Sequence, residues 1–307
     1  MKSYNQKKRI LNSESVTALM AAIHRFIATK ERGFVGPDQL ARMFLPPKAK
    51  FFLSFAFFRK VFKNKLHKMV PGTYEYVTAR TKFFDQLFVQ AVTENVPQIV
   101  FLGAGYDTRA LRFQDTIKET RIFELDVPTT QNNKLKLLKK NGIAIPANLS
   151  FAPVNFDTDD LGQALLNAGY DPHLMTLFMW EGVTMYITEE AVNETLSFIK
   201  NNSGAGSTVV FDYLYQSVIL YQSVILGQCD YYGARQLAES AKDKEEPFSF
   251  GIEEGQIKEF LLERGFSLLK HYTPQEFEKK YLVNKNGNFL GKMYGFACHT
   301  YAEAQDI

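Results

Sequence analysis

The sequence has few cysteines, no long hydrophobic run and no large excess of charge of one sign. Its two cysteines, Cys229 and Cys298, lie far apart and in no Cys-x-x-Cys pattern, which argues against a disulfide scaffold or a zinc site. The net charge of +3 over 307 residues gives no reason to expect a nucleic-acid partner. No window approaches the roughly 20 apolar residues of a membrane span, and the basic N-terminus lacks the apolar core of a signal peptide. These absences predict a globular cytoplasmic protein without stable membrane insertion.

Phenylalanine, by contrast, is abundant, with 27 copies in the chain. Many of them gather in residues 48–65, a stretch flanked by lysines. We expect a cap helix that packs its phenylalanines on the main domain and leaves its lysines in solvent, because the apolar residues crowd together without one clean face. A basic amphipathic helix on a membrane surface and a lid over an apolar substrate are the alternatives.

Residues 1–95 are predicted to form a helical N-terminal cap. An amphipathic segment near the start has Ser13 or Ser15 as its candidate N-cap. A second amphipathic segment, over 78–95, ends before Pro97.

From residue 96 onward, short apolar runs alternate with amphipathic segments, which predicts a parallel sheet covered on both faces. We expect an α/β fold with a doubly wound, Rossmann-like sheet of seven strands. Its last two strands form a hairpin-like pair, which allows an antiparallel last strand. The expected strands are 99–104, 120–126, 149–155, 174–181, 207–213, 266–272 and 293–302, and the expected helices are 107–115, 129–141, 159–168, 188–200 and 253–264.

Residues 215–250 are predicted to form a helical insertion before the last helix–strand units. It holds a perfect tandem hexapeptide, YQSVILYQSVIL, over 215–226. Two copies are too few for a solenoid, so we interpret them as a duplication that lengthens one packed helix. We therefore predict a single domain over 1–307. Its cofactor-binding core spans 96–214, and residues 251–307 form the C-terminal part of that core.

The stretch VFLGAGYDTRALRF indicates a strand, a glycine turn and the start of a helix. Gly103 and Gly105 would let the backbone bend sharply and approach a ligand closely. The N–H groups at the start of the following helix would point back toward that ligand.

The next expected strand ends in Asp126, 23 residues after Gly103, where an acidic side chain can accept both hydroxyls of a ribose. A dinucleotide fingerprint also requires a third small residue, but this chain has Thr108 there, and Asp107 would repel a pyrophosphate. A cofactor with a ribose and a cationic centre but no phosphates fits better, and S-adenosylmethionine (SAM) is such a molecule.

Four motifs occur in order: ARTKFFD, VFLGAGYDTRALRF, FELDVPTTQNNK and MWEGVTMYI. Together they resemble the leucine carboxyl methyltransferase family, over roughly residues 75–215, with fainter agreement to the C-terminus. That family includes enzymes that methylate the C-terminal leucine of a phosphatase and bacterial relatives that act on small molecules. The resemblance implies a class I methyltransferase fold and SAM as the cofactor.

The resemblance also implies a role for each matching residue. Arg80 would pair with the carboxylate of the methionine moiety, and Glu181 would lie near its amino group. Gly103 and Gly105 would line the methionine and ribose side, and Asp126 would hold the ribose hydroxyls.

At the adenine end the chain departs from the family pattern. The family usually has an aspartate followed by a leucine, whereas this chain has Asn155 and Phe156. An asparagine can still bond an adenine edge and a phenylalanine can still cover its face, and Asp157 is available to compensate.

Methyl transfer from SAM is an in-line displacement in which positioning carries most of the rate. A carboxylate acceptor is already ionised at neutral pH and needs no general base. None of the five histidines follows the carboxyl end of a central strand, which favours carboxyl methylation. Our candidates for acceptor binding and catalysis are Arg109, Tyr186 and Tyr213, and the acceptor is a small-molecule carboxylate or a peptide C-terminus.

Two other function classes stay open. A non-catalytic SAM-binding or scaffold protein would be compatible with the departure at Asn155 and Phe156. A nicotinamide-dependent oxidoreductase is opposed by the absent third glycine. The residue assignments also have structural alternatives: a helix cap for Asp126, and an ordinary helix start for Asp107 to Arg109.

Overall fold

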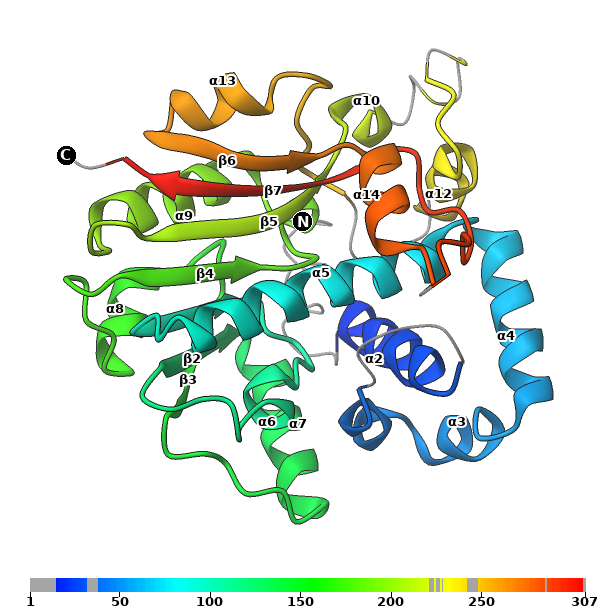
Figure 1. Cartoon of the computed structure of the whole chain (residues 1–307), viewed down its shortest axis with the longest axis horizontal. Coiled ribbons are helices and arrows are strands. Elements are labelled where there is room, and N and C mark those ends of the chain that lie inside the picture. The colour runs from blue at the N-terminus through cyan, green and yellow to red at the C-terminus, as the bar shows by residue number, and fades with distance from the viewer. Residues whose placement is uncertain are drawn as a thin grey trace, which may run out of the picture.

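The computed structural model describes residues 15–31, 38–220, 224, 227, 229–241, 248–284 and 286–305. A seven-stranded sheet in the order β3-β2-β1-β4-β5-β7-β6 lies at its centre (Figure 1). The strands are β1 (Gln98–Leu102), β2 (Arg121–Asp126), β3 (Leu149–Pro153), β4 (Thr176–Trp180), β5 (Thr208–Leu214), β6 (Phe266–Tyr272) and β7 (Ala297–Ala304). Neighbours among β1 to β5 pair in parallel, while β7 is antiparallel to both β5 and β6. The expected α/β fold with seven strands and an antiparallel last strand is therefore confirmed.

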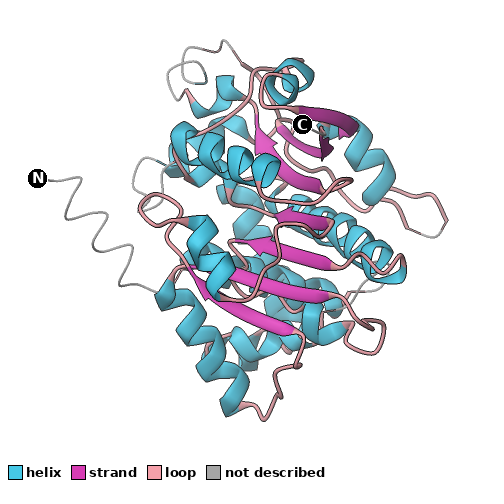
Figure 2. Ribbon diagram, turned by 90° about the vertical axis from the view of Figure 1, so that its left-hand side faces the viewer, coloured by secondary structure: helices cyan, strands magenta, loops and turns pink. Residues whose placement is uncertain are grey.

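Helices cover both faces of this sheet, which is why every residue of β1 and β4 is buried (Figure 2). On one face lie α5 (Thr73–Thr93), α7 (Pro128–Lys140) and α14 (Pro274–Tyr281), and on the other lie α8 (Leu161–Asn167) and α9 (Glu189–Asn201). Phe88 of α5 meets Phe101 of β1, with ring centroids 5.8 Å apart. The register places Glu124 beside Phe101, and α7 reaches that carboxylate through Lys134.

The N-terminal helices begin with α2 (Val16–Thr29), for which the Ser15 side chain accepts the Ala18 N–H at 3.1 Å. The other candidate cap, Ser13, lies outside the described residues. The chain continues through a short 3-10 turn, η1 (Leu40–Phe44), and through α3 (Pro47–Phe52) and α4 (Ala56–Met69). The long helix α5 then starts five residues before the expected 78 and ends before Pro97, as expected.

Two expected helices are shorter in the structure, and one helix was not expected. The helix expected over 107–115 is only the four-residue α6 (Arg109–Arg112), so it contributes little helix dipole to the glycine turn. Helix α14 was not foreseen, although Thr273 and Glu276 form a capping box that signals its start. The helix expected over 253–264 is the shorter α13 (Ile257–Leu262).

The expected packing of the phenylalanine-rich segment is wrong. Phe62 is partly buried against the core, but five other rings are 38% to 70% exposed. These five, which we call the aromatic patch, are Phe51, Phe52, Phe55, Phe57 and Phe58. They lie at the corner between α3 and α4, at the edge of the molecule away from the sheet (Figure 1). The phenylalanines therefore face outward instead of forming a cap.

Within the insertion, the described helices are α10 (Gln216–Ile219) and α12 (Ala234–Ala241). The first hexapeptide copy contains α10. The second copy falls largely on residues 221–223 and 225–226, which lie outside the described residues.

Candidate active site

The candidate site lies along the carboxyl ends of the parallel strands. The strand order reverses between β1 and β4, because β1 pairs with β2 on one side and with β4 on the other. In doubly wound sheets, the crevice at such a switch point is where ligands bind. The glycine turn follows β1 and Glu181 follows β4, so both border this crevice.

Asp126, at the end of β2, contacts the glycine turn directly. Its Oδ2 accepts the Gly105 N–H at 2.5 Å, and its Oδ1 accepts the Val127 N–H at 2.7 Å. The carboxylate is only partly buried. The structure thus brings together the acidic residue and the glycine turn that the sequence placed 23 residues apart.

The glycines at the crevice leave no room for a side chain. Gly103 has φ +73°, and a Cβ there would lie 2.5 Å from Cγ2 of Val183. Gly182 has φ +71°, and its Cβ would lie 2.6 Å from Nη1 of Arg80. Both positions require a left-handed backbone and lie close against the Val183 and Arg80 side chains, and we call these two glycines at the switch point the cradle.

Arg80 reaches this cradle from the middle of α5. Its Nε donates to Oε1 of Glu181 at 3.0 Å, and its Nη1 donates to Oδ2 of Asp212 at 3.1 Å. Its Nη2 has no hydrogen-bond partner within the described residues, so two N–H donors remain for a ligand carboxylate. The predicted partners Arg80 and Glu181 therefore lie side by side.

Asp212 of β5 is a site residue that the sequence analysis missed. It is fully buried and also accepts the Gly182 N–H at 2.6 Å and the Tyr76 hydroxyl. A signal was present, since an aspartate inside the apolar strand Thr208–Leu214 is costly unless it is paired.

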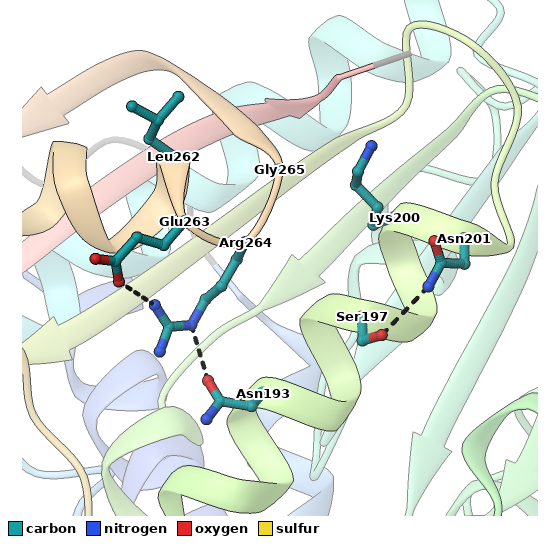
Figure 3. A pocket seen from close by; sticks show the side chains of 8 residues that line it. All are labelled: Asn193, Ser197, Lys200, Asn201, Leu262, Glu263, Arg264 and Gly265. Atoms are coloured by element: carbon teal, nitrogen blue, oxygen red, sulfur yellow. Dashed lines mark hydrogen bonds and ion pairs between the residues drawn. The ribbon is translucent and has the colours of Figure 1, made fainter. Parts of the chain in front are cut away.

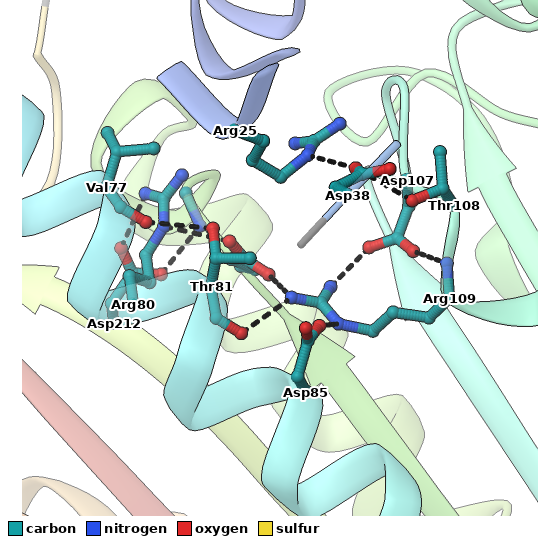
Figure 4. Close-up of polar contacts among 12 residues, drawn as sticks. Arg25, Asp38, Val77, Arg80, Thr81, Asp85, Asp107, Thr108, Arg109 and Asp212 are labelled. Atoms are coloured by element: carbon teal, nitrogen blue, oxygen red, sulfur yellow. Dashed lines mark hydrogen bonds and ion pairs between the residues drawn. The ribbon is translucent and has the colours of Figure 1, made fainter. Parts of the chain in front are cut away.

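Arg109, the first residue of α6, is fully engaged by carboxylates (Figure 4). Its guanidinium donates to Asp85 at 2.7 Å, to Glu181 at 2.8 Å and to Asp107. Only 2% of the residue is exposed. Arg109 is therefore not placed as a free cation for an acceptor, and it holds Glu181 in position instead.

Further pairs extend these contacts into one buried ion network. Arg112 bonds both oxygens of Asp85, and Arg25 bonds Asp38 at 2.8 Å. The network comprises four arginines and five carboxylates: Arg25, Arg80, Arg109, Arg112, Asp38, Asp85, Asp107, Glu181 and Asp212. Carboxylates thus exceed guanidinium groups by one, and no side chain in the network is more than 15% exposed.

The network keeps its members charged in spite of burial. Burial alone would raise the pKa of Asp107, but Arg109, Lys134 and Arg25 outweigh it and hold that pKa below its usual range. Burial likewise opposes the charged form of Arg109, yet the surrounding carboxylates raise its pKa. The excess negative charge suits a cationic ligand better than an anionic one.

His24 of α2 is a second buried group that the sequence analysis did not place here. Its Nδ1–H donates to the Met20 carbonyl at 2.6 Å, so its Nε2 carries a lone pair. That Nε2 is buried and has no hydrogen-bond partner within the described residues. Burial, together with the nearby cations Arg80 and Arg25, lowers the pKa of His24 to about 4, and the ring is neutral at pH 7.

The two candidate tyrosines lie in different places. Tyr186, in the turn η2 (Thr184–Tyr186) after β4, is partly buried at the carboxyl edge and its ring lies 5.3 Å from that of Phe248. Tyr213 alternates with Asp212 along β5 and so faces the opposite side of the sheet. Its hydroxyl lies 3.0 Å from Nε2 of His271, and the structure does not bring it to the network.

Asn155 and Phe156 follow β3, beside the end of β2, and both are partly buried. The Asn155 side chain accepts the Asp157 N–H at 3.1 Å, while Phe156 packs against the core. An extended ligand across the strand ends would therefore meet Asn155 and Phe156, then Asp126, then the glycine turn, and finally Arg80 and Glu181.

A separate hollow lies between α9 and the turn before β6 (Figure 3). Its volume is about 500 Å³, and polar side chains such as Asn193 and Arg264 line it. Lys200 in its wall donates to the Gln305 carbonyl at 2.8 Å, near the starts of β5 and β6. The hollow therefore lies at the amino edge of the sheet, away from the switch point, and we do not assign the cofactor to this hollow.

No helix in the described part of the chain is both long and apolar enough to cross a bilayer. In the same part, histidine, cysteine, aspartate and glutamate side chains form no group of three that could hold a metal ion.

Comparison with known proteins identifies the relatives of this chain. The family model described as leucine carboxyl methyltransferase matches residues 18–200. The “Putative S-adenosyl-L-methionine-dependent methyltransferase YktD” of Bacillus subtilis is 23% identical over 293 residues, which cover 90% of this chain and 94% of that protein. A Mycobacterium ulcerans protein of the same description is 35% identical over 138 residues, but the match spans only 44% of its length.

Among solved structures, a Thermobifida fusca protein described as a “putative methyltransferase” has a similar fold. The TM-score is 0.59 with 13% identity, and the alignment covers 96% of each chain. At this identity the likeness concerns the fold alone.

Proposed function

The chain belongs to the leucine carboxyl methyltransferase family and is a SAM-dependent methyltransferase, and from this premise we propose that it methylates a carboxylate, of a small molecule or a peptide C-terminus. The observation that supports SAM as the methyl donor most is the order of groups along the strand ends. From β3 to β4 the order is the pair Asn155 and Phe156, then the Asp126 carboxylate, then the glycine turn, and finally the Arg80 guanidinium, which comes from α5.

The residues fit SAM group by group. Asp126 would hold the ribose hydroxyls, and the turn of Gly103 and Gly105 beside it would line the methionine and ribose side. The Nη2 donors of Arg80 would bind the methionine carboxylate, with Glu181 beside them for the ammonium. The excess negative charge of the ion network complements a cofactor that is cationic overall.

When bound, SAM supplies an electrophilic methyl group on a sulfonium. An oxygen of the acceptor carboxylate would take this methyl group, and the carbon–sulfur bond would break with its electron pair left on sulfur. No proton moves, so the protein has to position the acceptor and exclude water. Helix α2 contributes to this enclosure, since Ala18 lies against Gly105.

A hydroxyl acceptor is the second candidate, because His24 has a buried lone pair beside Arg25 and Arg80. A base with a pKa of about 4 has little power to remove a proton from a hydroxyl at neutral pH. We therefore favour the carboxylate.

Calorimetric titration with SAM, its demethylated product and NADH tests cofactor binding. Asp126→Asn should weaken SAM binding about tenfold to hundredfold, because hydrogen bonds to a charged acceptor are lost. Asp115→Asn, a change at an exposed aspartate, is the matched control and should leave binding unchanged. Binding of NADH without SAM would contradict the proposal, and binding of neither would favour a scaffold protein.

Methyl transfer itself is tested with SAM that carries a labelled methyl group and a panel of carboxylic acids and leucine-ended peptides. A methyl ester releases labelled methanol in mild base, whereas a methyl ether does not. Base-stable label on a hydroxyl compound would replace the carboxylate proposal with the second candidate.

A further inference from the structure

The aromatic patch is an unusual surface for a folded protein, because its five phenylalanines are all exposed. Each of these rings contacts another at an edge-to-face angle, as Phe51 does with Phe55, at a centroid distance of 5.4 Å. The rings thus form one contiguous apolar surface rather than scattered side chains. They come from the corner between α3 and α4, which projects at the edge of the molecule (Figure 1).

Positive charge surrounds this patch without acidic residues in the same segment. Between Asp38 and Glu75 the chain has eight lysines and arginines and no aspartate or glutamate. The eight are Arg42, Lys48, Lys50, Arg59, Lys60, Lys63, Lys65 and Lys68. Lys63 pairs with Glu31, but Lys60, Lys65 and Lys68 are exposed. Burial and the neighbouring cations Lys140 and Arg42 lower the pKa of Lys50, so the positive field extends to α7.

From this combination we infer that the aromatic patch docks the protein on an anionic lipid surface. Exposed aromatic rings beside lysines are the arrangement by which a peripheral protein enters the interface of a bilayer. The rings would enter the region between headgroups and acyl chains, while the lysines would contact anionic headgroups through their long side chains.

Two other partners for the aromatic patch, a second copy of the chain and the chain's own first residues, fit its positive surroundings less well. A symmetric dimer through the patch would place eight cations against eight. Residues 1–14 carry four lysines and arginines and one glutamate, so the chain's own start would also bring positive charge. Six of the eight cations are lysines, which are depleted at the centres of protein–protein interfaces. The inference is independent of the proposed acceptor, since no patch residue belongs to the ion network.

Flotation of the full chain with vesicles tests this inference. We expect binding to vesicles of equal parts phosphatidylcholine and phosphatidylglycerol, and much weaker binding to phosphatidylcholine alone or at high salt. Phe57→Ser, at a ring 70% exposed, should lower the partition coefficient about tenfold. Leu166→Ser, a change at a residue 51% exposed on α8, is the matched control and should change nothing.

Charge is tested separately. The double variant Lys60→Glu with Lys65→Glu should weaken binding to the mixed vesicles about a hundredfold at low salt, and Lys118→Glu should not. Failure of the wild type to bind mixed vesicles, or binding unchanged by Phe57→Ser, would overturn the inference. So would sedimentation velocity that shows a dimer broken by Phe57→Ser without any vesicle binding. SAM titration of each variant reports the cofactor site independently.

Discussion

The buried ion network and the aromatic patch depart from the usual distribution of side chains in opposite directions. The network holds nine charged groups in the interior, whereas the patch holds five phenylalanines in solvent. Stability alone explains neither, because buried charge and exposed apolar surface both cost free energy. Our two proposals assign a use to each region: the network would border a bound cofactor at the strand ends, and the patch would dock on an anionic lipid surface.

The strongest way to break the network is to remove a cation at its centre. Arg109→Leu leaves Asp85, Asp107 and Glu181 without their shared partner, so we expect a loss of about 3–5 kcal/mol in the free energy of unfolding. Urea unfolding measures it. Arg235→Leu, which breaks an exposed pair with Glu239, is the control and should change little. Equal losses in both variants would mean that burial does not increase the contribution of these ion pairs to the free energy of unfolding.

The pH dependence of stability sharpens the same comparison. His24 has a pKa of about 4 in the folded protein against 6.5 when exposed, so the unfolded chain binds its proton first as pH falls. The contribution of neutral His24 to the free energy of unfolding is complete above pH 6.5. It decreases by about 3 kcal/mol as the pH falls toward 4. His24→Phe should remove this dependence. The difference between wild type and variant cancels other groups, such as Glu124, whose pKa burial raises to about 7. Parallel stability curves would contradict a buried neutral His24.

A smaller effect tests the cradle. Gly182→Ala would force a strained backbone and press a Cβ against the Arg80 guanidinium, and we expect a loss of about 1–3 kcal/mol and weaker SAM binding. Gly142 has a similar φ of +68° but open space around it, so Gly142→Ala measures the backbone cost alone. If the two variants lost the same free energy of unfolding, the close contact between Gly182 and Arg80 would make no contribution to stability.

The smallest effect is expected at the patch. Phe57→Ser should change the free energy of unfolding by no more than about 0.5 kcal/mol, since an exposed ring loses little burial. Phe84→Ala, on the buried face of α5, should cost about 3–5 kcal/mol. Thermal unfolding of both variants measures the contrast, and a large loss at Phe57 would show that the patch supports the fold.

Much of the fold could be predicted because its signals are local. Apolar runs and helical periodicity indicated all seven strands and the long helix that became α5. Motif order also led to the family. The misses include α14, whose capping box was overlooked, and the outward-facing phenylalanines, whose crowding resembles that of a buried helix.

The amino-acid sequence by itself determined the strands, the glycine turn and the acidic end of β2, because each depends on residues close together in the chain. Only the tertiary structure decided that Asp212, Asp85 and Asp38 surround the arginines, since they come from three different parts of the chain. It also decided that His24 is buried and Phe57 is exposed. Burial depends on which element packs against a side chain, and no local pattern contains that information.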